Sequence, residues 1–285
     1  MREGQGIRSF STYVVAAGVV TLAAVATAGA SSSQWDVDSR SAVRLVTARS
    51  IVESGVKFLR AGVEIRLQPG WKTYWRYPGD SGVPPTFDIG GSENVKSITV
   101  LWPAPERFSD GVGYSIGYRN GVLLPLRILP RDERKPVILR LKLDYAVCDT
   151  LCVPAKANLE LQLTEADTAH ESIIAAAEAR VPKPAAVGSG QSLVIRSINR
   201  LLGMFGNRLL VDVASVAPNR VDLFAEGPDR WALPLPKPVP APQSGLRRFD
   251  LELDGVPPNA RIDGAMLRFT AVGGSQAIEV EYRLE

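Results

Sequence analysis

Apolar and polar residues alternate along much of the chain from about residue 40 onward. Residues 59–67 and 137–145 contain apolar side chains at every second position, and residues 159–163 repeat the pattern. A period of two puts successive side chains on opposite faces of a strand, so each segment predicts a half-buried β-strand. Turn sequences such as Pro78-Gly79-Asp80 and Asn120-Gly121 lie between such segments. The spacing predicts an antiparallel β-sandwich over residues 40–163.

The alternation stops after residue 163. Residues 164–167 have the composition of a helix N-terminal cap, and the alanine-rich residues 173–179 favour a helix. Prolines 182 and 184 end this pattern, and Gly188-Ser189-Gly190 follows. We therefore expect residues 164–190 to form a helix and a linker between two domains.

Alternation resumes in the last third of the chain. Several short segments between residues 191 and 285 show it, which predicts a second, smaller β-sandwich domain. Residues 233–240 carry a proline at nearly every second position. Because proline cannot donate a hydrogen bond to a neighbouring strand, this stretch is expected to be an edge strand or a loop.

The first thirty residues follow the layout of an export signal. Arg2 and Arg8 precede an apolar run that ends in small residues, and Ser31-Ser32-Ser33 follows. This order predicts a cleavable signal peptide over residues 1–30 and an exported mature protein. The alternative is an uncleaved membrane anchor, although the run is rich in alanine, glycine and threonine and is only weakly hydrophobic.

Composition narrows the possible functions. The chain has 285 residues, a net charge of +3 and no dense run of basic residues, which gives no basis for a nucleic-acid partner. It contains one histidine, His170, so a metal site built from several histidines is excluded. Any triad that needs a second histidine is excluded as well. We expect the function to use no metal and no cofactor.

Cys148 and Cys152 are the only cysteines and lie where one predicted strand ends and the next begins. In an exported protein they are expected to form a disulfide. Closing a loop this short stabilises the fold by about 2 kcal/mol, whereas a hundred-residue loop would contribute about 4.7 kcal/mol. A closely spaced pair at a turn is also accessible to a foreign thiolate. From the spacing alone, a redox role and a structural role remain equally open.

A resemblance to a known family bears on that choice. Residues 70–76, 101–103, 118–126 and 145–154 resemble, in the same order, the N-terminal periplasmic domain of the thiol:disulfide interchange protein DsbD. Residues 74–85 resemble the ScsB-type branch of this family in particular. The similarity extends over about residues 43–163 and places the cysteines at the position expected for the family.

The resemblance implies an immunoglobulin-like sandwich with a redox-active cysteine pair at its surface. In the family, this pair receives electrons from a thioredoxin-like domain supplied by a membrane thiol transporter. It passes them to periplasmic disulfide isomerases or to thioredoxins of cytochrome c maturation. By position, Cys152 would form the mixed disulfide with a partner, and Cys148 would resolve it. The chain would then act as a protein-disulfide reductase that depends on a separate membrane transporter for its electrons.

Four further residues are candidates near the pair. The family has a cap loop, which corresponds to residues 108–114 here, so Phe108 or Tyr114 would shield the sulfurs. Strand alternation places Trp71 and Trp75 on one face and Tyr74 on the other. We interpret one face as sandwich core and the other as a neighbour of the site, with a binding surface for a sugar or a partner as the alternative, and Tyr74 is a candidate neighbour. Trp71 is retained as a second neighbour. The cysteine spacing is shorter here than in better-known members of the family.

Two acidic residues near the pair, Asp144 and Asp149, are open to two interpretations. They would either accept protons and raise a thiol pKa, or lie in solvent at a turn. For the whole protein, two hypotheses follow. The first is exported thiol:disulfide exchange, and the second is a non-catalytic exported module for binding or assembly whose disulfide only fixes a turn.

Overall fold

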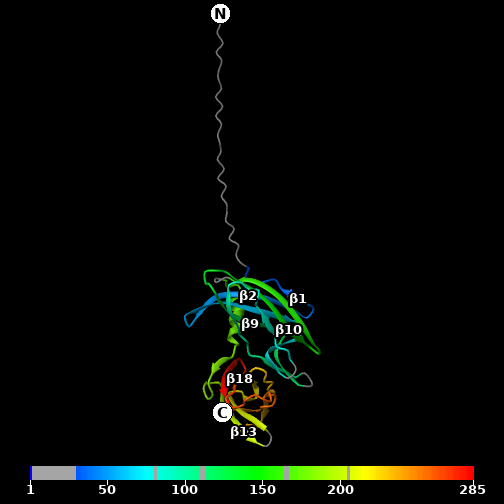
Figure 1. The fold of residues 1–285 in the computed structure, drawn as a ribbon, viewed down its shortest axis with the longest axis vertical. Helices are drawn as coiled ribbons and strands as arrows, with labels where there is room; N and C mark the ends of the chain where they lie inside the picture. Colours follow the sequence, from blue (N-terminus) through cyan, green and yellow to red (C-terminus); the bar gives the residue numbers. More distant parts are fainter. Residues whose placement is uncertain (2–29, 80–81, 110–112, 164–166, 204–205) are drawn as a thin grey trace.

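The computed structural model describes the chain apart from residues 2–29, 80–81, 110–112, 164–166 and 204–205. The described residues form four β-sheets, with one α-helix between the second and third sheets (Figure 1). The predicted all-β class and immunoglobulin-like sandwich are confirmed. The predicted signal peptide lies almost wholly outside the described residues. Within the described part of the chain, no helix has the length and apolar character to cross a membrane.

Among the described residues, eleven strands form the first sandwich. One sheet has the order β1-β2-β3-β9-β6, and the other has the order β11-β10-β4-β8-β7 with β5 paired to β10. The strands are β1 (Asp36–Val37), β2 (Ser41–Glu53), β3 (Val56–Leu67), β4 (Lys72–Gly79), β5 (Thr86–Asp88), β6 (Val95–Val100), β7 (Glu106–Ser109), β8 (Tyr114–Arg119), β9 (Gly121–Pro130), β10 (Val137–Cys148) and β11 (Cys152–Leu163). Alternate apolar residues of both sheets meet in one core, as the period of two predicted.

The second sandwich also consists of two sheets, with the orders β12-β19-β18-β15 and β13-β14-β17-β16. Its elements are β12 (Lys183–Ala185), β13 (Leu193–Gly203), β14 (Gly206–Ser215), the 3-10 helix η1 (Pro218–Arg220), β15 (Val221–Glu226), β16 (Lys237–Val239), β17 (Leu246–Glu252), β18 (Met266–Gly273) and β19 (Gln276–Arg283). The proline-rich stretch supplies β16, an edge strand as expected. Part of the segment expected to be a linker, residues 183–185, instead forms β12. This strand pairs in parallel with β19 and so belongs to the second sandwich.

Helix α1 (Glu171–Ala179) lies against the first sandwich. Ile174 is fully buried against Val46 and Ala48 of β2. Arg60, whose side chain is only 5% exposed, binds the carboxylates of Glu171 and Glu178. These contacts with the sheet, rather than a local cap, determine where the helix lies.

The start of α1 corrects one prediction. The helix begins after His170 rather than at the cap expected in residues 164–167, of which only Asp167 is described. Asp167 instead accepts a hydrogen bond from the backbone N–H of Ala169, which closes a local turn. His170 is half-buried and makes no side-chain cap hydrogen bond.

The ion pairs of Glu178 predict an acid-sensitive contribution to stability. Burial of Glu178 favours its neutral form, but hydrogen bonds from Arg60 and Arg127 outweigh this and lower its pKa. A carboxyl whose pKa is lowered by folding stabilises the protein above its unfolded pKa of about 4.3, and this contribution is lost as the pH falls through the folded pKa. Glu178→Gln is expected to reduce the free energy of unfolding by about 2 kcal/mol at pH 7.

Urea denaturation at neutral and acidic pH measures this effect. The difference between wild type and Glu178→Gln should shrink as the pH falls below the unfolded pKa. Glu160, which pairs with Arg140 at the surface, provides the control, and Glu160→Gln should change stability by less than about 1 kcal/mol. A Glu178→Gln difference that stays constant with pH would show that these ion pairs do not stabilise the docked helix.

Candidate redox site

The two cysteines lie at the end of the β10–β11 hairpin. Cys148 is the last residue of β10, Cys152 is the first of β11, and the two face each other in register. Their Cα atoms are 4.3 Å apart and their sulfurs are bonded. Because the hairpin brings these positions together by itself, the disulfide adds no connection between distant parts of the fold.

The two sulfurs belong to residues with different exposure. Cys148 is 5% exposed and belongs to a small cluster with Tyr74 and Ala146. Cys152 is exposed, and Leu151 beside it is 75% exposed. A thiolate from another protein can therefore approach Cys152 from solvent, whereas Cys148 lies on the protein side of the bond.

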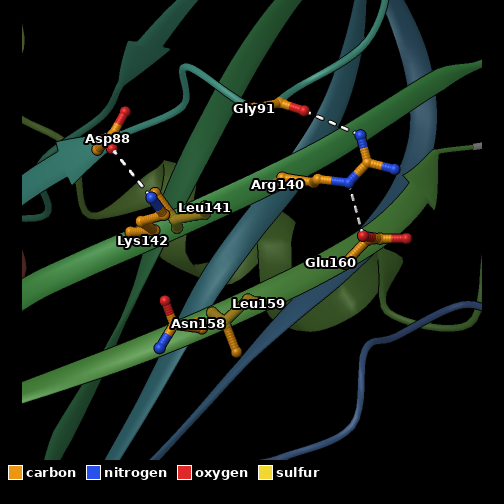
Figure 2. Close-up of a pocket in the computed structure, with 8 residues that line it drawn as sticks. All are labelled: Asp88, Gly91, Arg140, Leu141, Lys142, Asn158, Leu159 and Glu160. Carbon is orange, nitrogen blue, oxygen red and sulfur yellow. Dashed lines mark hydrogen bonds and ion pairs between the residues drawn. The ribbon is translucent and has the colours of Figure 1, made fainter.

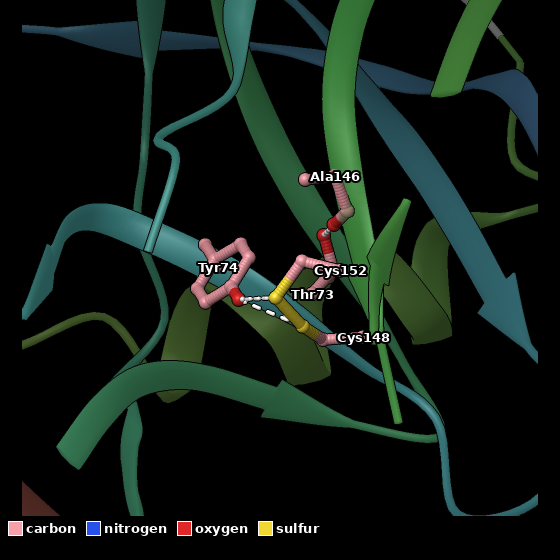
Figure 3. Close-up of a disulfide and its surroundings, with 5 residues drawn as sticks. All are labelled: Thr73, Tyr74, Ala146, Cys148 and Cys152. Atoms are coloured by element: carbon pink, nitrogen blue, oxygen red, sulfur yellow. Dashed lines mark hydrogen bonds between the residues drawn. A yellow bond between two sulfur atoms is a disulfide. The ribbon is translucent and has the colours of Figure 1, made fainter. Parts of the chain in front are cut away.

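Tyr74 contacts both sulfurs. Its side chain comes from β4 and is 3% exposed, and its hydroxyl lies 2.9 Å from Cys148 Sγ and 2.8 Å from Cys152 Sγ (Figure 3). A phenol can donate a hydrogen bond to sulfur, and the bond is stronger when the sulfur is a thiolate. Tyr74 is thus placed to stabilise the sulfur that leaves when the disulfide is opened.

Strand β4 is held beside the disulfide by its neighbours. Thr73 Oγ1 donates a hydrogen bond of 2.9 Å to the carbonyl of Ala146 on β10, as Figure 3 shows. On the other side, a Cβ at Gly117 of β8 would lie 1.9 Å from the carbonyl oxygen of Thr73. Glycine at 117 therefore lets β8 approach β4 at the residue before Tyr74.

The other three candidate neighbours lie in β7, at the start of β8 and directly before β4. Phe108 is buried in β7, and the cationic groups of Lys72 and Arg119 lie 5.3 and 4.9 Å from its ring centroid. Tyr114 begins β8 and is 46% exposed. Residues 110–112 of the expected cap loop lie outside the described residues. Trp71 packs against the main core, with the Arg40 guanidinium over its ring.

Lys72 is a neighbour that the sequence analysis did not single out. It pairs in register with Cys148 across β4 and β10 and is largely buried. The signal was present in the alternation of β4, which puts Lys72 on the same face as Tyr74. Of the two acidic candidates, Asp144 pairs with Lys156 at 2.7 Å in solvent, and Asp149 is exposed in the hairpin turn.

A groove on β10 and β11 is lined by residues 88, 91, 140–142 and 158–160, and neither cysteine is among them (Figure 2). Its charged side chains are paired with one another or with close neighbours: Arg140 with Glu160 and Glu93, and Lys142 with Asp88. The described residues hold no cluster of three or more side chains suited to a metal ion. The groove therefore adds no catalytic group to the disulfide.

Comparisons with known proteins agree with this geometry. Residues 45–164 match the family model of the thiol:disulfide interchange protein DsbD, N-terminal. This match confirms the resemblance of the first sandwich to the DsbD N-terminal family. A comparison with curated proteins gave no match.

A solved structure shares the fold of both sandwiches. It is the N-terminal periplasmic domain of ScsB from Proteus mirabilis, with a TM-score of 0.70 and 20% sequence identity. The alignment covers 89% of this chain and 98% of that chain. The match therefore includes the second sandwich, which the family model does not cover.

Proposed function

We propose that this protein is a periplasmic thiol:disulfide exchange protein that relays reducing equivalents through Cys148 and Cys152. The observation that carries the proposal is the pairing of an exposed Cys152 with a buried Cys148 beside the Tyr74 hydroxyl. The DsbD family match over residues 45–164 supports thiol:disulfide exchange as the chemistry. The proposed clients are periplasmic thioredoxin-fold proteins, namely disulfide isomerases and thioredoxins of cytochrome c maturation. The electrons would come from a separate membrane thiol transporter.

The exchange proceeds in two balanced steps. A donor thiolate attacks Cys152 Sγ, the Cys148–Cys152 bond breaks, and Cys148 leaves with the electron pair as a thiolate. The second thiol of the donor, as a thiolate, then attacks the donor's first sulfur in the mixed disulfide, and Cys152 leaves with the electron pair as a thiolate. The donor leaves as a disulfide, and the chain keeps two electrons and two protons as a dithiol. Reduction of a client runs the same steps in reverse, beginning with attack by the Cys152 thiolate.

Tyr74→Phe tests the hydrogen bond to the leaving sulfur. The variant keeps the ring but loses the hydroxyl, whose hydrogen bond to a charged group contributes about 1.5–3 kcal/mol. We expect reduction of the disulfide by a protein thiol to slow by about tenfold to a hundredfold. Stopped-flow fluorescence measures the rate. Tyr145→Phe is the matched control, since the Tyr145 hydroxyl lies 2.6 Å from Ser41 Oγ of the opposite sheet, and it should retain the wild-type rate. Equal slowing in the two variants would exclude the assigned role.

The proposed function is tested with purified components. The reduced protein is mixed with an oxidised periplasmic thioredoxin-fold isomerase, and free thiols are alkylated at intervals and counted by mass spectrometry. Two electrons should move between the proteins, with one disulfide lost and one gained. No transfer in either direction, with any thioredoxin-fold partner tried, would favour the alternative of a non-catalytic module with a structural disulfide.

A further inference from the structure

Strand β4 contains an unusually large bulge directly after Tyr74. Tyr74 pairs with Gly117 of β8, and the next paired position joins Gly79 to Ser115. Four residues of β4 therefore lie opposite one residue of β8, Ile116. A bulge bends a strand and redirects its side chains, and bulges occur often beside functional sites. This one separates Tyr74 from the remainder of the strand.

The side chains of the bulge bind the second sandwich. Trp75 is fully buried and lies 5.8 Å from the Phe224 ring, centroid to centroid. The Arg76 guanidinium donates hydrogen bonds of 2.6 and 2.9 Å to the carboxylate of Glu226 and one of 2.5 Å to that of Glu279. The Tyr77 hydroxyl donates a hydrogen bond of 3.0 Å to the carbonyl of Leu233. Three successive residues after Tyr74 are thus fixed by contacts from outside their own sheet.

The Arg76 ion pairs are the directional part of this contact. The side chains of Arg76, Glu226 and Glu279 are at most 23% exposed. Two carboxylates hold one planar guanidinium, which fixes its position and orientation. Glu226 ends β15 and Glu279 lies in β19, so the anchor is part of a folded sheet rather than a mobile loop.

We propose that the second sandwich positions Tyr74 for exchange, with Glu226 and Glu279 holding Arg76 and thereby the bulge of β4. The inference rests on the proposed exchange at Cys148–Cys152 and assigns a task to the second sandwich within it. Tyr74 touches the sulfurs, whereas Arg76, Glu226 and Glu279 act through it as positioning residues. Without the anchor, the bulge gains freedom, and the hydroxyl spends less time within hydrogen-bond distance of the two sulfurs.

The test is a double-mutant cycle in the full chain. The first change is Glu226→Gln with Glu279→Gln, and the second is Tyr74→Phe. The readout is the rate at which dithiothreitol reduces the disulfide, together with the equilibrium against glutathione. The matched control is Asp222→Asn, since Asp222 accepts a 2.7 Å hydrogen bond from Arg107 and so joins the sandwiches through β7.

The carboxamide changes should slow reduction by about fivefold when Tyr74 is present and have no further effect when it is phenylalanine. Asp222→Asn should leave the rate unchanged. Equal slowing in both backgrounds, or no slowing in either, would overturn the inference. If the variant with both glutamines does not fold, Arg76→Lys replaces it. Lysine keeps the positive charge but lacks the planar guanidinium that binds both carboxylates, so the same coupling to Tyr74 is expected.

The small-molecule reductant separates this inference from the proposed function. Coupling seen with dithiothreitol, but no exchange with any thioredoxin-fold protein, would contradict the function and leave the positioning intact. Exchange with a protein partner, without coupling between Tyr74 and the carboxylates, would contradict only the positioning.

Discussion

Replacing both cysteines by serine is expected to abolish exchange while leaving the fold in place. The disulfide closes a hairpin of five residues, for which the chain-entropy estimate is about 2 kcal/mol. The strands that carry Cys148 and Cys152 are paired over their whole length without it. The variant should therefore unfold in one transition at a slightly lower temperature, with an unchanged circular dichroism spectrum, and transfer no electrons.

The opposite outcome would identify a structural disulfide. A loss of most of the unfolding free energy in the double serine variant would mean that the bond holds the hairpin together. Denaturation of the wild type with and without a reductant gives a second measure of the same quantity. Reduction should lower stability by about 2 kcal/mol, as the substitutions do.

Trp75→Ala is expected to have the largest effect on stability. The side chain is fully buried in the core of the first sandwich and also contacts Phe224 of the second. Truncating a buried tryptophan costs about 3–5 kcal/mol, because packing is lost and a cavity remains. Since residue 75 follows Tyr74 directly, the alanine variant should also exchange more slowly. Urea denaturation measures the first effect and dithiothreitol reduction the second.

Trp75→Phe is the control for that substitution. The Nε1 atom of Trp75 is buried and has no hydrogen-bond partner among the described residues. Phenylalanine keeps an aromatic ring against Phe224 and removes this unsatisfied donor, so it should recover much of the stability lost in the alanine variant. Equal losses in both variants would mean that ring packing at this position does not join the two sandwiches.

Local sequence patterns predicted much of the fold. Alternation in residues 137–145 and 159–163 corresponds to β10 and β11, and proline-rich residues 233–240 include the edge strand β16. The start of α1 and the strand β12 were not predicted, because each depends on distant partners. Arg60 binds Glu171 from the sheet, and Lys183–Ala185 pairs with β19 almost a hundred residues later in the chain.

In the candidate site, too, local patterns predicted some features, whereas others depend on distant contacts. Spacing predicted the cysteine pair, and strand alternation predicted that Tyr74 faces away from Trp71 and Trp75. The difference in burial between Cys148 and Cys152 arises from packing against β4, which no local pattern encodes. The bulge after Tyr74 was hidden for a related reason, since its apolar and polar residues are distributed between the core and the second sandwich.

The central claim is that a foreign thiol exchanges with Cys152 while Cys148 stays on the protein side. Disulfide trapping with single-cysteine variants tests it most directly. Cys148→Ser and Cys152→Ser are each mixed with a periplasmic thioredoxin-fold isomerase that keeps only its attacking cysteine, under mildly oxidising conditions. Non-reducing electrophoresis and mass spectrometry then locate the bond. The Cys148→Ser variant should form a mixed disulfide through Cys152, and Cys152→Ser should form little. Equal trapping by both variants, or by neither, would contradict the account.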